Sequence, residues 1–271
     1  MNVMKSYLPT VVGVAVLLCS LPAVAQGQPV FQMSPPQAQL DSFFFFHSAV
    51  MRLEMAFPGA TIHYSLDEAT VTQESPRYRQ PIVLEDSDTL YTRVFHPELQ
   101  PSSHLQLSAH KINRKAEQPS ISVAPLPSAK YAGAGLWVLT DYKKGQLNFA
   151  SDTEQWLGWE VDTLRLSLTW SAPTAVEDLS CSFLQNHGAW IFPPQEVLAW
   201  HNGQQVGRAA IDVPKQEEPT TFRLVHVPLK AGQYTQLELV LVAARLPAWH
   251  QGAGRSAWIF MDELLITEKQ P

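Results

Sequence analysis

The sequence has little charge, few cysteines and no hydrophobic run long enough for a transmembrane helix, and each shortage excludes a class of protein. Of its 271 residues only 16% are charged, and 25 acidic side chains outnumber 19 basic ones. A general nucleic-acid-binding protein needs a basic surface to neutralise phosphates, so we expect no nucleic-acid partner. The longest apolar run, 11–21, is shorter than the roughly 20 residues that cross a bilayer, so we expect no stable membrane insertion.

Residues 1–25 have the pattern of a cleaved secretory signal. Lys5 gives a positive start, the apolar run follows, and Ala23–Ala25 places small side chains where a signal peptidase reads them. We therefore expect cleavage before Gln26 and an exported protein, either periplasmic or extracellular. Of the two cysteines the mature chain would keep Cys181, so it could form no internal disulfide and a hydrophobic core must hold each domain.

The rest of the chain has the patterns of β-strands. Thr163–Trp170 alternates polar with large apolar residues, and Leu237–Val242 is an almost continuous apolar run that suits a strand buried on both faces. Asn202 and Gly203 lie between two further strand-like runs and predict a hairpin turn. No stretch sustains the 3.6-residue period of a capped helix. The pattern predicts an all-β protein with few, short helices.

Proline marks the expected domain boundaries. The segment 113–128 carries three prolines among polar residues, namely Pro119, Pro125 and Pro127. This composition predicts an extended linker between a smaller domain, 26–112, and a larger one, 129–271. Both lengths suit β-sandwiches, the smaller immunoglobulin-like and the larger a jelly roll. The run Phe43–Phe46 is interpreted as an edge of the smaller domain's core.

Four short motifs of the smaller domain resemble one known family. They are Ile62–Asp67, Ser75–Tyr78, Gln80–Ile82 and Asp88–Phe95. Their order resembles the small chitobiase/hexosaminidase C-terminal module over about residues 47–112. Glu68 stands where that family usually has glycine, so the turn after Asp67 is expected to differ.

The larger domain resembles a second family. The motifs are Leu139–Asp141, Trp156–Trp159, Trp190–Pro194 and the long run Leu246–Leu264. They are similar to the discoidin-like module (factor V/VIII type C, galactose-binding-like) that ends many bacterial family 20 β-N-acetylhexosaminidases, which implies a discoidin-like jelly roll. The enzyme itself resides in a barrel with an Asp-Glu pair in an H-x-G-G-D-E motif. This chain has no Gly-Gly dipeptide and too few residues for the barrel, so we expect no enzymatic activity.

Asp262 and Glu263 are adjacent carboxylates in a strand-like run. Neighbours in a strand point to opposite faces and cannot act on one substrate, yet at least one must be partly buried and needs a partner. In the resembling modules a calcium ion often joins a loop aspartate to a glutamate of the last strand. The resemblance thus implies a structural Ca²⁺ held by Asp141, Glu263 and the nearby Asp152. A hydrogen bond or an arginine partner is an equal alternative.

Tryptophans in turn-rich stretches are candidates for stacking on sugar rings. Five residues are predicted to bind carbohydrate: Trp249, His250, Trp156, Trp159 and Trp190. Packing is the alternative for each tryptophan. The sequence favours an exported, non-catalytic carbohydrate-binding protein, with N-acetylhexosamine-containing glycans as candidate ligands. Two alternatives stay open, a protein-interaction module that docks a separate glycosidase or surface complex and, less favoured, hexosaminidase activity.

Overall fold

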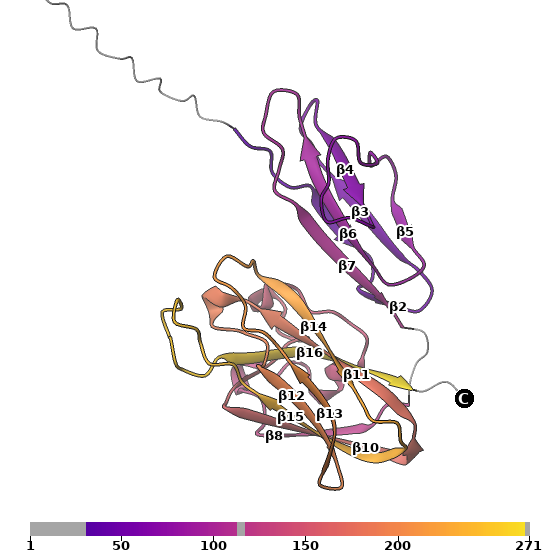
Figure 1. Ribbon diagram of the computed structural model, residues 1–271, viewed down its shortest axis with the longest axis vertical. Coiled ribbons are helices and arrows are strands. Elements are labelled where there is room, and N and C mark those ends of the chain that lie inside the picture. The colour runs from indigo at the N-terminus through magenta and orange to yellow at the C-terminus, as the bar shows by residue number, and fades with distance from the viewer. Residues whose placement is uncertain (1–30, 113–116, 269–271) are drawn as a thin grey trace, which may run out of the picture.

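The computed structural model describes residues 31–112 and 117–268, which form two β-sandwich domains (Figure 1). The helices in these ranges are 3₁₀ segments of three to five residues, namely η1 (Ala129–Tyr131), η2 (Leu136–Thr140), η3 (Phe149–Ser151) and η4 (His187–Ala189). The all-β prediction is therefore confirmed. The expected signal segment and its cleavage position lie outside the described residues. Within the described part of the chain no helix is long and apolar enough to cross a membrane.

The smaller domain has two sheets. Its strands are β1 (Gln37–Leu40), β2 (Phe44–Phe45), β3 (Ala49–Glu54), β4 (Thr61–Ser65), β5 (Ile82–Leu84), β6 (Asp88–Phe95) and β7 (Leu105–Lys111). One sheet has the order β1-β3-β5 and the other β2-β7-β6-β4. Met51 and Leu53 of the first sheet share a buried cluster with Leu90 and Val94 of the second. The domain is thus a β-sandwich, as the sequence predicts.

The larger domain is a second sandwich of nine strands. They are β8 (Ser120–Ala124), β9 (Leu157–Glu160), β10 (Thr163–Thr174), β11 (Val176–Gln185), β12 (Glu196–His201), β13 (Gln204–Ala210), β14 (Thr221–Pro228), β15 (Tyr234–Val242) and β16 (Trp258–Glu268). Their order is β13-β12-β15-β10-β8 in one sheet and β14-β11-β16-β9 in the other. Every pair is antiparallel, as in a jelly roll.

Alternation along β10 builds the core of this sandwich. Leu164, Leu166 and Leu168 are fully buried and lie opposite leucines of the central strand β15. The hairpin prediction is also confirmed, because β12 and β13 are joined by Asn202 and Gly203 at φ values of 49° and 76°. Positive φ at both turn positions is what a two-residue hairpin of type I′ requires.

The predicted linker is shorter than the proline pattern suggests. Residues 120–124 form β8, which pairs with β10 from Arg165↔Ala124 to Thr169↔Ser120 and is an edge strand of the larger domain. The prolines flank this strand at 119 and 125, and an edge strand tolerates nearby proline because only one side of its backbone is hydrogen-bonded. The boundary at residue 129 is therefore corrected toward the N-terminus.

Candidate functional site

Three long loops of the larger domain gather at one end of its sandwich. Strand β11 ends at Gln185, which pairs with Thr221 at the start of β14. The loop after β11 also meets the start of β16, because Phe192 N–H donates to the carbonyl of Trp258 at 3.1 Å. The loops 186–195, 212–220 and 243–257 therefore face the same side of the domain.

An aromatic cluster ties two of these loops together. The Trp249 ring lies 5.1 Å from the His187 ring and 6.0 Å from the Phe192 ring, measured between centroids. His187 stacks on Phe192 at 4.8 Å with an interplanar angle of 20°. Trp249 is partly exposed, whereas Phe192 is fully buried. Trp249 thus presents part of an indole on a rigid base.

His250 holds this base in place rather than facing solvent. Its Nδ1 accepts a hydrogen bond from Gly252 N–H at 3.1 Å, which leaves Nε2 to donate to the carbonyl of His187 at 2.9 Å. Both ring nitrogens are used, and 8% of the residue is exposed. The structure therefore gives His250 a positioning role in the loop pair.

Trp190 lies on the other side of His250. Its ring is 5.2 Å from that of His250, and the Arg255 guanidinium sits 4.7 Å above it. Residue 252 must be glycine here, because a Cβ at that position would come within 2.5 Å of the Trp190 ring. Trp190 is thus partly buried between two loops and an arginine.

Trp156 and Trp159 are interior residues. Each is 1% exposed, and the two indole N–H groups donate to the carbonyls of Gln146 and Pro125 at 3.0 and 3.1 Å. Because neither ring has a face open to a ligand, these two tryptophans pack the core and take no part in the site proposed below.

Polar side chains near the His187 loop come from separate parts of the chain, with Gln185 at the end of β11, Glu218 in the loop 212–220 and Arg223 in β14. Gln185 Nε2 donates to Glu218 Oε2 at 3.3 Å, and an Arg223 nitrogen lies 3.6 Å from the same oxygen. Within the described residues, no hydrogen-bond partner reaches the buried atom Gln185 Oε1, whereas the backbone of Gln216 acts on the His187 imidazole. Gln185 is itself 0% exposed, so the groups of this cluster that a ligand could contact are the partly exposed Trp249, His187 and Glu218.

The charge states of this cluster follow from its surroundings. A hydrogen bond from the Lys215 backbone is the main cause that lowers the pKa of Glu218, so this carboxylate is ionised near neutral pH. Burial lowers the pKa of His187 from its ordinary value, which keeps the imidazole neutral. The cluster thus offers a neutral imidazole and a carboxylate, supported by the buried amide of Gln185.

The two adjacent carboxylates of β16 are both fully buried, and among the described residues only Asp262 has hydrogen-bond partners. Asp262 Oδ2 accepts hydrogen bonds from Lys144 Nζ at 2.5 Å and Gly145 N–H at 2.7 Å. The backbone can approach Asp262 this closely because residue 145 is glycine. A Cβ at this position would lie 2.5 Å from the Trp156 ring. Asp262 is thus one half of a buried ion pair.

Glu263 faces Asp141 on the other side of the strand. Burial, followed by the charges of Asp141 and Asp262, raises the pKa of Glu263 to about 10. The backbone groups of Tyr142 and Leu264 lower this pKa in part, although neither makes a hydrogen bond of standard geometry with the Glu263 carboxyl group. In the part of the chain that the structure describes, Glu263 Oε1 and Oε2 and Asp141 Oδ2 have no hydrogen-bond partner.

These unpaired oxygens fit the chemistry of a hard cation, but only two of the three predicted ligands come together. Asp141 uses its other oxygen to accept from Lys143 N–H at 2.9 Å and Gln155 Nε2 at 3.0 Å. Asp152 instead accepts from Gln146 N–H at 2.9 Å within its own turn. Accordingly, no group of three or more His, Cys, Asp or Glu suited to a metal is found among residues 31–112 and 117–268.

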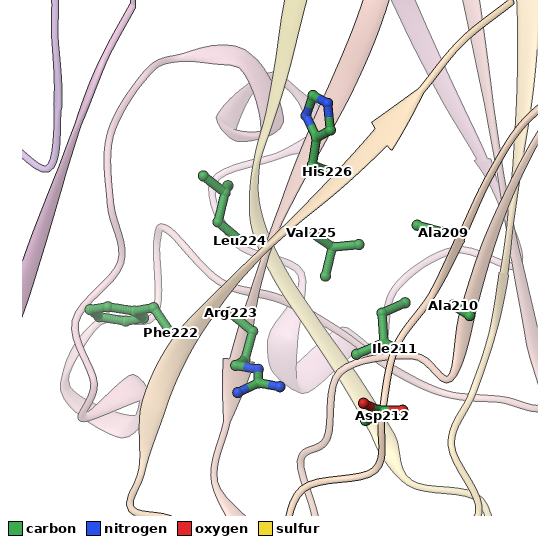
Figure 2. Close-up of a pocket in the computed structure, with 9 residues that line it drawn as sticks. All are labelled: Ala209, Ala210, Ile211, Asp212, Phe222, Arg223, Leu224, Val225 and His226. Carbon is green, nitrogen blue, oxygen red and sulfur yellow. The ribbon is translucent and has the colours of Figure 1, made fainter. Parts of the chain in front are cut away.

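A groove of about 450 Å³ lies between the edge strands β13 and β14 (Figure 2). Its charged groups are Asp212 and Arg223, with His226 further along β14. Its aromatic residue, Phe222, turns away from β13 in Figure 2 and stacks at 6.2 Å on Trp156. The groove therefore lacks a ring on which a sugar could stack.

Comparison with protein families matches residues 45–106 to the chitobiase/beta-hexosaminidase C-terminal domain. This match confirms the resemblance predicted for the smaller domain. No relative is found among curated proteins.

Several solved structures are similar to the chain, and those named here are carbohydrate-binding proteins. The lectin-binding domain of Lectinolysin, complexed with Lewis b, has 11% identity and a TM-score of 0.38 over 59% of this chain and 99% of its own. CpGH89CBM32-4 of Clostridium perfringens, in complex with GlcNAc-α-1,4-galactose, has 14% identity and a TM-score of 0.33 over 56% and 91%. A fucolectin from striped bass (Morone saxatilis) has 8% identity and a TM-score of 0.33 over 86% of this chain and 85% of its own. At these scores the likenesses carry no argument about what this chain binds.

Proposed function

We propose that this chain is an exported, non-catalytic carbohydrate-binding protein whose larger domain holds a glycan at the Trp249 loop end. The observation that carries the proposal is the partly exposed Trp249 indole, which packs on His187 and Phe192 at the end of the sandwich where three loops meet. An indole face accepts the apolar face of a pyranose ring, and planar polar groups beside it hydrogen-bond the hydroxyls.

The site is suited to a neutral sugar. Glu218 is ionised, but an Arg223 nitrogen lies 3.6 Å from its carboxylate, so the pair has no net charge and gives an ionic sugar no advantage. Glycans that contain N-acetylhexosamine are the first ligands to test, because the family matched by the smaller domain accompanies chitobiases and β-hexosaminidases.

A hydrolytic role has no support in the carboxylates of β16. Asp262 and Glu263 are each 0% exposed, and they lie on opposite faces of one strand. A substrate could reach neither without opening the sandwich. We therefore expect no release of chromophore from an aryl N-acetylglucosaminide, and release that is lost in Glu263→Gln would overturn this part of the proposal.

Calcium is the proposed structural ion of the larger domain. Asp141 and Glu263 would hold it through three carboxylate oxygens that lack hydrogen-bond partners among the described residues, one of which lies 4.0 Å from Lys143 Nζ, and backbone carbonyls or water would complete its shell. When bound, the ion would neutralise the two facing carboxylates and fasten the Asp141 loop to β16. A melting temperature that neither calcium nor chelator changes would contradict this proposal.

A glycan array on the full chain tests the main proposal. Wild type should bind a restricted set of neutral glycans, and Trp249→Ala should lose binding. Trp137→Ala is the matched control, because Trp137 is 58% exposed in the same domain but lies on η2, away from the Trp249 cluster. Equal loss in both variants, or full binding by Trp249→Ala, would contradict the assignment of the site.

One surface favours the alternative that the protein docks on a partner protein. A pocket of about 330 Å³ in the smaller domain is lined by Phe31, Met33, Met55, Phe57 and Leu99. Phe31 and Phe57 are 70% and 46% exposed, an unusual display of large apolar side chains. Co-purification of a protein that Phe57→Ser releases, with no glycan signal for wild type, would favour this function.

Export is proposed from the first 25 residues alone. N-terminal sequencing of protein from the native cell should begin at Gln26. A mature chain that starts at Met1 would contradict it.

A further inference from the structure

The two domains meet through aromatic side chains. Phe43, just before β2, lies 5.7 Å from Phe222 of β14, and Phe46 lies 5.2 Å from Tyr142, measured between ring centroids. Figure 1 shows β2 and the end of β7 as the parts of the smaller domain nearest the larger one. The middle of the Phe43–Phe46 run is buried in the smaller domain's core, as predicted, whereas its two ends contact the larger domain.

A buried lysine of the larger domain lies at this junction. The Lys144 side chain is 7% exposed, and its ammonium group forms the ion pair with Asp262. The same ammonium group sits 3.7 Å from the centroid of Phe222 and 5.6 Å from that of Phe43. Lys144 thus places a positive charge against a ring from each domain.

His110 contacts the same phenylalanine from within the smaller domain. Its ring, on β7, lies 5.1 Å from Phe43 and 6.2 Å from Phe44. The charged group that acts on it from the larger domain is Lys144, which is itself influenced by Asp262, Glu263 and Asp152. The carboxylate nearest the ammonium group, that of Asp262, already pairs with Lys144.

We propose that acid separates the two domains, because a proton on His110 puts a second positive charge at a junction that Lys144 already occupies. Neutral His110 packs on Phe43 as an aromatic ring. Protonated His110 must either be desolvated next to a like charge or withdraw with its domain. The junction would therefore act as a pH-sensitive contact between the smaller domain and the larger one.

The direction of the effect follows from linkage. Burial, and then the charge of Lys144, lowers the pKa of His110 from its ordinary value of 6.5 in the docked state. The part of this lowering that comes from Lys144 exists only while the domains are docked. Docking therefore releases protons, and the docked state becomes less favourable as the pH falls. Each unit by which docking lowers this pKa shifts the docking equilibrium by about tenfold.

Small-angle X-ray scattering of the full chain at pH 8 and pH 5 tests the proposal. The wild type should have a larger radius of gyration at pH 5, with near-UV circular dichroism showing that both domains stay folded. His110→Gln should keep the smaller radius at both pH values. His110→Lys should have the larger radius at both.

His104→Gln is the matched control, because His104 is an exposed histidine of the same domain and should leave the wild-type response intact. A wild-type radius that is equal at pH 8 and pH 5 would overturn the proposal. So would an acid expansion that persists in His110→Gln, or one accompanied by unfolding in both proteins.

Discussion

Replacing Asp262 by asparagine tests the buried ion pair most sharply. Asparagine keeps an oxygen that can accept from Gly145 N–H but removes the charge that neutralises Lys144 at 2.5 Å. The side chains are 7% and 0% exposed, so water cannot replace the lost partner. Breaking a buried pair in this way costs about 3–5 kcal/mol of the free energy of unfolding.

The cost has an upper limit that depends on pH. Without its counterion, Lys144 can become neutral by releasing its proton. For a lysine with an ordinary pKa this costs about 5 kcal/mol at pH 7 and about 2 kcal/mol at pH 9. Asp262→Asn should therefore destabilise the protein by about 3–5 kcal/mol at pH 7 and by about 2 kcal/mol or less at pH 9. The structure favours this relief, because burial lowers the pKa of Lys144.

Urea unfolding followed by tryptophan fluorescence measures this change, since all eight tryptophans lie in the larger domain. The double variant with Lys144→Met should recover most of the loss, because no unpaired charge remains buried. A loss below about 1 kcal/mol at pH 7, the size of an exposed pair, would refute the reasoning.

Two further predictions concern buried titratable groups. The raised pKa of Glu263, about 10 against an ordinary 4.5, means that its contribution to stability is fully present below pH 4.5 and is lost as the pH rises. In chelator, Glu263→Gln should thus show a flatter decline of unfolding free energy from pH 5 to pH 9 than wild type, and parallel curves would contradict this. Burial raises the pKa of Cys181 to about 12, so its thiol should not react with a thiol reagent until the protein is unfolded in urea, and reaction at the rate of a free cysteine in the native state would contradict its buried position.

Strands were predictable where the pattern was local. The alternation of Leu164, Leu166 and Leu168 fixes which face of β10 is buried, and the Asn202-Gly203 pair alone determines a turn. Strand β8 was not predictable from its own residues, since its flanking prolines also suit a linker. Its place depends on a free edge of β10, which is set by residues far away in the chain.

The site was predictable only in part, for the same reason. In the sequence, Trp156 and Trp249 look like equivalent candidates for stacking on a sugar. In the structure, Trp156 is enclosed by Phe222, Phe260 and Lys144, whereas Trp249 keeps part of its ring exposed. The predicted partner for a buried carboxylate exists at Asp262, but it is a lysine from a loop 118 residues away. Gln185 and His187 are neighbours in the sequence, but Glu218 joins them only through folding, and no spacing in the sequence indicates it.

Direct binding of a neutral glycan to Trp249→Ala, compared with wild type and Trp137→Ala, tests the central claim most directly. Isothermal titration with the best ligand from the array should give binding for wild type and Trp137→Ala. For Trp249→Ala we expect a loss of at least about tenfold in affinity, which corresponds to about 1.4 kcal/mol. Equal affinity in all three proteins would contradict the claim that the Trp249 loop end is the sugar-binding site.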